Sequence, residues 1–251
     1  MKKLFKNPLI LFALAIVLIA GSSVGAASAA FVYTTEAQQV NFSTAQISVA
    51  LEEANSDNNY NQVEKLSFEN MQSDNDNGGI KIGKKYDEKV RVTNNSNQTT
   101  GYAEYVRVIV TKSWKNKEGV KDTTLSPELI KLDIADGWYL DTTASTSEQS
   151  VYYLTSPLAN GASKDFISAI TLDNEIVTKG AVTTSETDDK GYTTITTTYE
   201  YNGQTFNVDL EVDAVQTHNA VDAIRGAWGV TATTDKADDG NITSINGKSV
   251  N

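Results

Sequence analysis

The sequence predicts an all-β protein, an antiparallel β-sandwich with one or two short helices. Apolar and polar residues alternate along several stretches, which is the period of a strand with one buried face. Clusters of Asn, Asp, Ser and Gly separate most of these stretches, as turns do. Many strands without helices between them are typical of two packed antiparallel sheets.

The first 29 residues have the pattern of a cleaved secretory signal peptide. Three lysines precede an apolar stretch of twelve residues, Leu9 to Ala20. A permanent membrane anchor is the alternative, but a spanning helix needs roughly 20 apolar residues. The small residues Ala27 and Ala29 mark the expected cleavage site, so the mature chain is predicted to begin at Ala30.

The segment 30–44 follows the predicted cleavage site and carries large apolar side chains. These are Phe31, Tyr33, Val40 and Phe42. A solvated chain end gains nothing from such residues, because they stabilise a structure only when they are removed from water. We therefore expect the segment to be buried against something.

A sandwich domain is predicted over residues 45–230. In 105–111, Val106, Val108 and Val110 alternate with polar or larger residues, which predicts a central strand. In 205–215 the apolar residues alternate with Asn207, Asp209, Glu211 and Asp213, which predicts a strand with one solvated face. Weaker strands are predicted at 47–51, 90–93, 151–154, 166–172 and 192–201.

Turn and helix patterns complete the prediction. The pair Asn202–Gly203 between two strand patterns predicts a β-hairpin. A short helix is expected within residues 126–134, with Pro127 as its first residue. Residues 219–229 predict a second helix that lies on the sandwich, with Val221, Ile224 and Trp228 on one face. Residues 231–251 are polar and are expected to form a tail.

Charge and cysteine content exclude several classes of partner. Removing the three N-terminal lysines leaves 18 basic against 32 acidic side chains, a net charge of −14, which repels phosphate backbones and anionic lipid surfaces. We expect no nucleic-acid partner, and membrane contact only through an uncleaved signal peptide. The chain has no cysteine, so disulfides, thiolate metal sites and lipidation of an N-terminal cysteine are impossible.

Catalytic and metal-site patterns are weak, and we predict no catalytic residue, no metal and no cofactor. The single histidine, His218, stands at the start of the second predicted helix without a nucleophile motif. Asp74 to Gly78 offers oxygen ligands at alternate positions, as a calcium loop does, but lysines stand where a bidentate glutamate is needed. We interpret this stretch as a solvated turn.

Two groups of side chains are compatible with carbohydrate chemistry. Asp209, Glu211 and Asp213 are acidic enough for glycoside hydrolysis but more simply mark the solvated face of a strand. Three tryptophans are candidates for a sugar-stacking platform, although we expect them in the core. They are Trp114, Trp138 and Trp228.

Three segments in order resemble the TasA and camelysin family of exported Gram-positive proteins. They read "AASAAFVYTTEAQQVNFSTAQISVAL", "KIGKKYDEKVRVTNNSNQTTGYAEYVRVIVTKSW" and "VDAIRGAWG", with "DGWYL" between the last two. The resemblance implies a jelly-roll sandwich, export to the cell surface or extracellular matrix, and assembly into a biofilm fibre. It also implies that the N-terminal segment of one subunit is inserted as a strand into the next. The partners would then be other copies of the chain, and matrix or cell-wall components.

A physical reason supports insertion of residues 30–44 into a neighbour. A sheet that lacks a strand has unpaired backbone groups, and an extended segment from another copy pairs with them. Burying four such side chains stabilises the contact by about 6 to 12 kcal/mol before ordering costs. The alternative is that the segment folds back as an edge strand of its own domain, because a sequence does not distinguish the two. A camelysin-like metalloprotease and a monomeric adhesive or carbohydrate-binding module are the other functions we consider.

Overall fold

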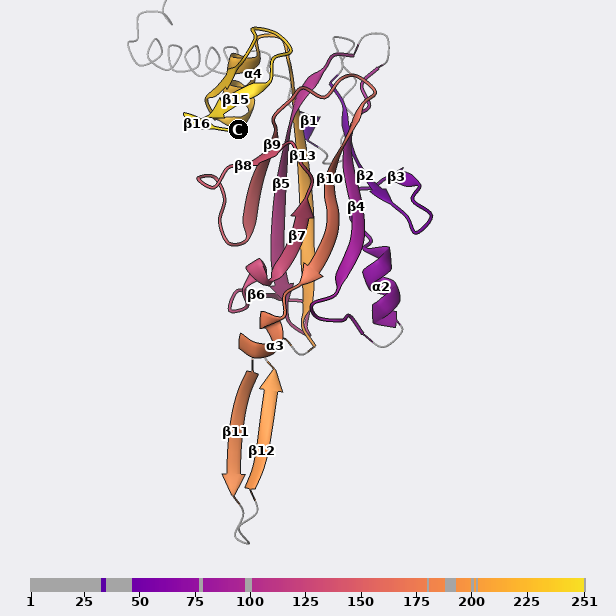
Figure 1. The fold of residues 1–251 in the computed structure, drawn as a ribbon, viewed down its shortest axis with the longest axis vertical. Coiled ribbons are helices and arrows are strands. Elements are labelled where there is room, and N and C mark those ends of the chain that lie inside the picture. The colour runs from indigo at the N-terminus through magenta and orange to yellow at the C-terminus, as the bar shows by residue number, and fades with distance from the viewer. Residues whose placement is uncertain are drawn as a thin grey trace, which may run out of the picture.

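The protein is an antiparallel β-sandwich, which confirms the all-β prediction (Figure 1). The computed structural model describes residues 33–34, 47–76, 79–97, 101–179, 181–187, 193–199, 201 and 203–250. One sheet has the order β1 (Tyr33–Thr34), β13 (Thr205–Gln216), β5 (Glu104–Lys115), β9 (Gln149–Leu154) and β8 (Trp138–Leu140), with β6 (Lys121–Asp122) beside β5. The other has the order β3 (Tyr60–Gln62), β2 (Val49–Ala54), β4 (Lys85–Asn94), β10 (Ser163–Leu172) and β7 (Ile130–Ile134). The jelly-roll connection order stays a prediction.

Strand β5 is the centre of the first sheet, as its alternation predicts. It pairs with β13 along twelve residues and with β9 on its other side. Val106, Val108 and Val110 are at most 1% exposed and lie in the main core between the two sheets. The alternate residues of β5 that include these valines thus lie on the face of the first sheet that packs against the second.

Residues 126–134 do not form the predicted helix. Pro127–Leu129 make a single 3₁₀ turn, η2, and the chain continues as β7. Ile130, Leu132 and Ile134 alternate, and they are opposite Leu172, Ile170 and Ile167 of β10. A strand buries these residues against the core, which a two-turn helix would not, so the tertiary pairing overrides the helix-start signal.

The predicted hairpin at Asn202–Gly203 is also wrong. Asn202 lies outside the described residues, and Gln204 closes a turn onto the Tyr201 carbonyl. The flanking strands separate: β12 (Thr193–Tyr199) pairs with β11 (Ala181–Thr187), and β13 pairs with β5. The apolar face of β13 completes the core only beside β5, so the two threonine-rich strands pair with each other. They extend beyond the end of the sandwich, with α3 (Glu175–Lys179) at their base (Figure 1).

The second predicted helix is confirmed as α4 (Ala220–Trp228). Asn219 precedes it, and Gly229 ends it in the left-handed conformation, with φ of 70°, that helix ends favour. Ile224 and Trp228 are buried against the outer face of the first sheet, whereas Val221, expected on the same face, is exposed.

Residues expected to form a polar tail instead form a small sheet. β14 (Ala232–Thr234), β15 (Ile242–Ile245) and β16 (Lys248–Ser249) pair in order. Ile242 and Ile245 are at most 2% exposed, in a second core with α4, Tyr105 and Tyr153. We call α4 and β14–β16 the cap. It lies at the opposite end of the molecule from the β11–β12 hairpin (Figure 1).

Two helices, α2 (Glu69–Asp76) and α3, were not predicted, and α2 packs beside β4. Among the described residues no helix has the length and apolar content that a membrane crossing needs. The predicted signal peptide, residues 1–29, lies outside the described part of the chain.

Candidate assembly edge

Strand β13 is fully paired on one side, and on the other side the described residues pair with it at one end. Its twelve residues all pair with β5, and on the other side Asp213 and Ala214 pair with Thr34 and Tyr33 of β1. Within the described residues no strand pairs with this side of Thr205 to Val212, the stretch that we call the β13 edge. Every second residue of the edge directs its N–H and C=O away from β5, so the edge is a template for another strand.

Partly exposed apolar side chains lie along the β13 edge. Val208 and Val212 are buried in the main core, whereas Phe206 and Leu210 are only partly covered. The ring of Phe206 meets the ring of Phe68 edge to face, with centroids 6.1 Å apart. The β13 edge is therefore apolar, and no described strand pairs with it, which are the two properties that strand addition requires.

A buried carboxylate holds Phe68 in place. Phe68 has φ of 52°, a left-handed conformation that is unfavourable for a bulky residue. Glu53, on the core-facing side of β2, accepts hydrogen bonds from the Phe68 N–H at 2.9 Å and from the Ser67 N–H and hydroxyl. These bonds also satisfy free N–H groups at the start of α2. The conformation of Phe68 thus depends on an acidic side chain buried beside the core.

Glu88 of β4 lies next to Glu53 and is 4% exposed. Its Oε1 atom has no hydrogen-bond partner among the described residues. Burial, and then the neighbouring Glu53 carboxyl, raise the pKa of Glu88 to about 9. Glu88 is therefore neutral at neutral pH.

An ion pair fixes the cap end of β13 to β5. Asp213 is fully buried and accepts hydrogen bonds from the Arg107 guanidinium, with the Nε atom at 2.9 Å. The guanidinium also lies 5.5 Å from the ring centroid of Trp228 in the cap. Because Asp213 is the residue opposite Thr34, this rigid end of β13 is also where the N-terminal strand pairs.

Most residues of the predicted N-terminal site lie outside the described part of the chain. This holds for the cleavage-site residues Ala27, Ala29 and Ala30, and for Phe31, Val40 and Phe42. Tyr33 is placed through its backbone, which pairs within the same chain. At these two residues the structure therefore has the intrachain pairing that we kept as the alternative to insertion.

The other candidate groups are not brought together. The side chain of His218 is 83% exposed, and its Nδ1 atom lies 3.3 Å from Asp238 in the cap. Asp74 to Asp76 lie in α2, and Asn77 and Gly78 are outside the described residues. No cluster of metal-ligating acids or histidines occurs in the described ranges.

The tryptophans and the acidic strand face follow the prediction in part. Trp114 and Trp228 are buried, as expected, and Trp138 is partly exposed with its ring edge to face with Phe166. On β13, Asp209 and Glu211 are exposed, as expected. Asp213 is not, because the cap covers the sheet at this point.

The sequence did carry a sign of the buried charges, and we missed it. Glu104 and Lys112 have the same parity on β5 as Val106, Val108 and Val110, so they face the inside of the sandwich. Burial raises the pKa of Glu104 to about 9, and neither carboxyl oxygen has a hydrogen-bond partner among the described residues. A charged residue at a core-facing position is the pattern that could have identified them.

Comparison of the chain with protein-family models, with curated proteins and with solved structures gave no match.

Proposed function

We propose that the protein is an exported structural subunit that polymerises head to tail, with the N-terminal segment of one copy adding a strand to the β13 edge of the next. The observation that carries this proposal is that, among the described residues, one side of β13 is paired only at its cap end. Within that part of the chain two of its twelve residues are paired there, and their partner is the N-terminal segment itself. The same backbone groups that accept this segment continue along the β13 edge.

The N-terminal segment has the length that the edge requires. Tyr33 is opposite Ala214 and Thr34 is opposite Asp213 in an antiparallel pair. If a neighbour's segment keeps this register, residue 31 is opposite Gln216 and residue 42 is opposite Thr205. Residues 31–42 would then cover β13 from end to end, and each outward backbone group of the β13 edge would gain a partner.

Register also determines which apolar side chains a neighbour buries. Directly opposite residues share a face of the sheet. In a continuous register Phe31 and Tyr33 lie on the same face of the sheet as Ala214, which faces the core. Val40 and Phe42 are then opposite Asn207 and Thr205, which lie on the outer face. A single β-bulge in the donor strand restores the core-facing parity of Val40 and Phe42. The bulge doubles the number of buried apolar side chains from two to four. The stabilisation from their burial rises from about 3 to 6 kcal/mol to about 6 to 12 kcal/mol, before ordering costs are subtracted.

Such a contact joins two different surfaces and therefore does not close on itself, so its repetition gives an open filament. The intrachain pairing of Tyr33 and Thr34 competes with it. In the same register an intermolecular strand would pair along the whole length of the edge. Removal of the signal peptide would free the segment for this exchange.

Size-exclusion chromatography of the processed protein, residues 30–251, and of a variant without residues 30–44 tests the proposal. We expect concentration-dependent oligomers of the first and a folded monomer of the second. An excess of a peptide with the sequence of residues 30–44 should cap the edge and shorten the oligomers. Monomers of both proteins at every concentration would refute assembly.

A further inference from the structure

A cavity of about 320 Å³ opens between the two sheets on the side away from the β13 edge. It lies where β9 of one sheet faces β7 of the other, with η2 and the turn before β9 at its mouth. Two apolar side chains, Val110 and Leu132, form part of its wall. The remaining lining is polar or charged, which is unusual for the interior of a sandwich. We call it the Lys112 cleft.

Lys112 makes the cleft cationic. On β5 it stands between Val110 and Trp114, two core residues that are at most 3% exposed, so its side chain starts on the inner face of the sheet. Its Nζ atom donates a hydrogen bond to the Ile130 carbonyl at 2.8 Å. Burial, and then repulsion from the Lys131 ammonium, lower the pKa of Lys112. A lysine at such a position is costly, since its charge gives up hydration for one carbonyl.

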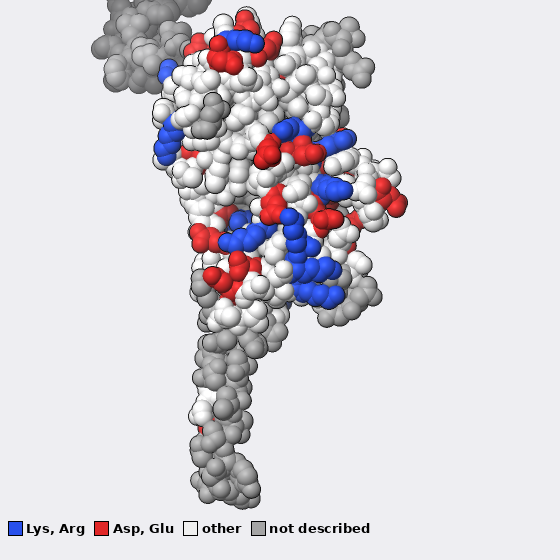
Figure 2. Space-filling model, in the orientation of Figure 1, with Lys and Arg blue, Asp and Glu red and all other residues white. Residues whose placement is uncertain are grey.

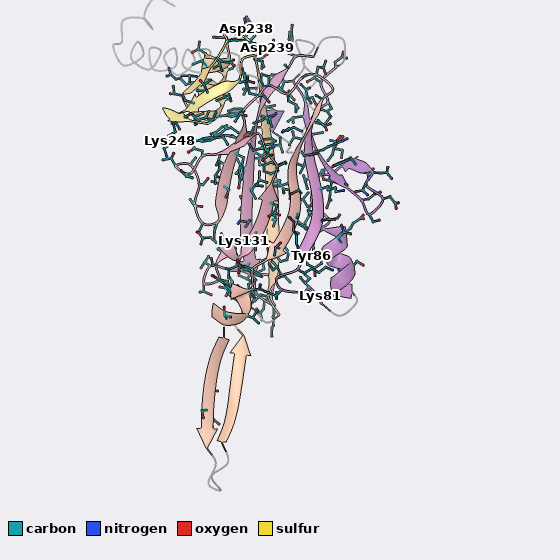
Figure 3. The ribbon with its side chains drawn as sticks, in the orientation of Figure 1. Lys81, Tyr86, Lys131, Asp238, Asp239 and Lys248 are labelled. Carbon is teal, nitrogen blue, oxygen red and sulfur yellow. The ribbon has the colours of Figure 1, made fainter. Side chains whose placement is uncertain are left out.

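Lys131 places a second ammonium group at the cleft. Its side chain is half exposed, and its nearest described carboxylate, Asp173, is at 3.9 Å, which is a loose ion pair. Figure 3 shows Lys131 in the half of the sandwich that carries the β11–β12 hairpin, where Figure 2 shows Lys and Arg side chains interspersed with Asp and Glu on the visible face. Lys112 and Lys131 both line the cavity, so an anion bound there would be attracted by both ammonium groups.

Hydroxyl groups line the part of the cleft formed by β9, the neighbour of β5 in the same sheet. Thr146 and Ser147 of the turn before β9, and Ser150 and Tyr152 of β9, line the cleft. A wall of hydroxyls donates and accepts hydrogen bonds equally well, and it therefore suits the hydroxyl groups of a ligand. Glu128 stands at the η2 side and would repel a second negative charge.

We propose that the Lys112 cleft binds a small hydroxylated anion, either a sugar acid or a sugar phosphate. The anionic group would lie between the ammonium groups of Lys112 and Lys131, and the ligand hydroxyls would contact the wall of Thr146, Ser147 and Ser150. The cavity has room for one sugar unit, which restricts the ligand to a monosaccharide or to the end of a chain. The site does not depend on assembly, because it lies on the side of the sandwich away from the β13 edge.

Isothermal titration calorimetry of the processed protein tests this inference with four probes: glucuronate, glucose 6-phosphate, inorganic phosphate and neutral glucose. We expect saturable binding of at least one of the two sugar anions and none of glucose. The two sugar anions distinguish a carboxylate from a phosphate site, and inorganic phosphate reports what the charge alone contributes.

Three variants separate the cleft from general charge. Lys131→Gln removes a half-exposed ammonium with little risk to folding, and we expect it to weaken binding roughly ten- to hundredfold, as the loss of a charge-assisted hydrogen bond does. Lys112→Met should abolish binding. Lys236→Gln, an exposed lysine of the cap with the same change of charge, should leave the affinity within about twofold.

Three results would overturn the inference. The first is no saturable heat with any anion at millimolar concentration, and the second is equal affinity for glucose. The third is an equal loss of affinity in Lys131→Gln and Lys236→Gln. Should Lys112→Met fail to fold, the comparison of Lys131→Gln with Lys236→Gln still decides.

Discussion

Replacing Glu88 by Gln should stabilise the protein at neutral pH. The carboxyl of Glu88 is buried beside Glu53, and its pKa is raised from 4.5 to about 9. The folded state keeps a proton that the unfolded chain loses above about pH 4.5. Stability is therefore highest below pH 4.5, falls as pH rises towards 9, and is constant above 9 with respect to this group.

The size of the effect follows from the width of this window. Each pKa unit corresponds to about 1.4 kcal/mol, so the roughly three units between pH 4.5 and pH 7.5 cost about 4 kcal/mol at pH 7.5. Local relaxation reduces this, and we expect Glu88→Gln to raise the free energy of unfolding by about 2 to 4 kcal/mol at pH 7.5. A glutamine has the shape of the neutral carboxyl and donates to the Glu53 carboxylate in its place.

Urea denaturation at pH 4.5, 6, 7.5 and 9 measures both quantities. The variant and the wild type should be equally stable at pH 4.5 and should diverge steadily above it. Glu64→Gln, at an exposed position, is the matched control and should follow the wild type. A constant difference between Glu88→Gln and wild type at all four pH values, or a variant that is less stable at pH 7.5, would refute a shared proton.

Three further predictions concern the β13 strand, the cap and the hairpin. Arg107→Ala leaves Asp213 buried without a partner and should lower the free energy of unfolding by about 3 to 5 kcal/mol, whereas Arg107→Ala with Asp213→Asn should recover part of this loss in the same urea assay. Ile242→Ala should lower the free energy of unfolding by about 2 to 5 kcal/mol if the cap folds as part of the domain. A loss below about 0.5 kcal/mol, the usual effect of a surface substitution, would contradict that. Replacement of residues 181–199 by a short glycine–serine turn should shift the melting temperature by less than about 4 °C, since the hairpin pairs only with itself among the described strands; a larger loss would mean that it packs on the body.

The sequence predicted the elements whose signals are local. The valine alternation of β5 arises from strand period and the Gly229 end of α4 from C-capping, and both agree with the structure. The helix also begins after Asn219 as predicted, although the Asn219 side chain makes no capping hydrogen bond. The cap sheet was missed because β15 contributes only two large apolar residues, Ile242 and Ile245. Their burial depends on Tyr153 and Trp228, which are distant in sequence.

The candidate site was predictable from one side only. The apolar character of residues 31–42 indicates a donor, but the acceptor becomes apparent only when β13 is found beside β5 and β1 is found to cover two residues of it. The left-handed Phe68 and the Glu53–Glu88 pair depend on the contact between β2, β4 and the start of α2. No local pattern marks such a contact.

An intermolecular disulfide measures the proposed pairing most directly, because the chain has no cysteine of its own. Residues opposite each other in an antiparallel pair are close enough for a disulfide. A copy with Val40→Cys is mixed with a second copy, of different mass, that carries either Asn207→Cys or Val208→Cys. The account predicts a cross-linked dimer of mixed mass, with Asn207→Cys if the register is continuous and with Val208→Cys if the donor strand is bulged. A chain with both substitutions that cross-links only within itself, with no mixed dimer from separate copies, would contradict it.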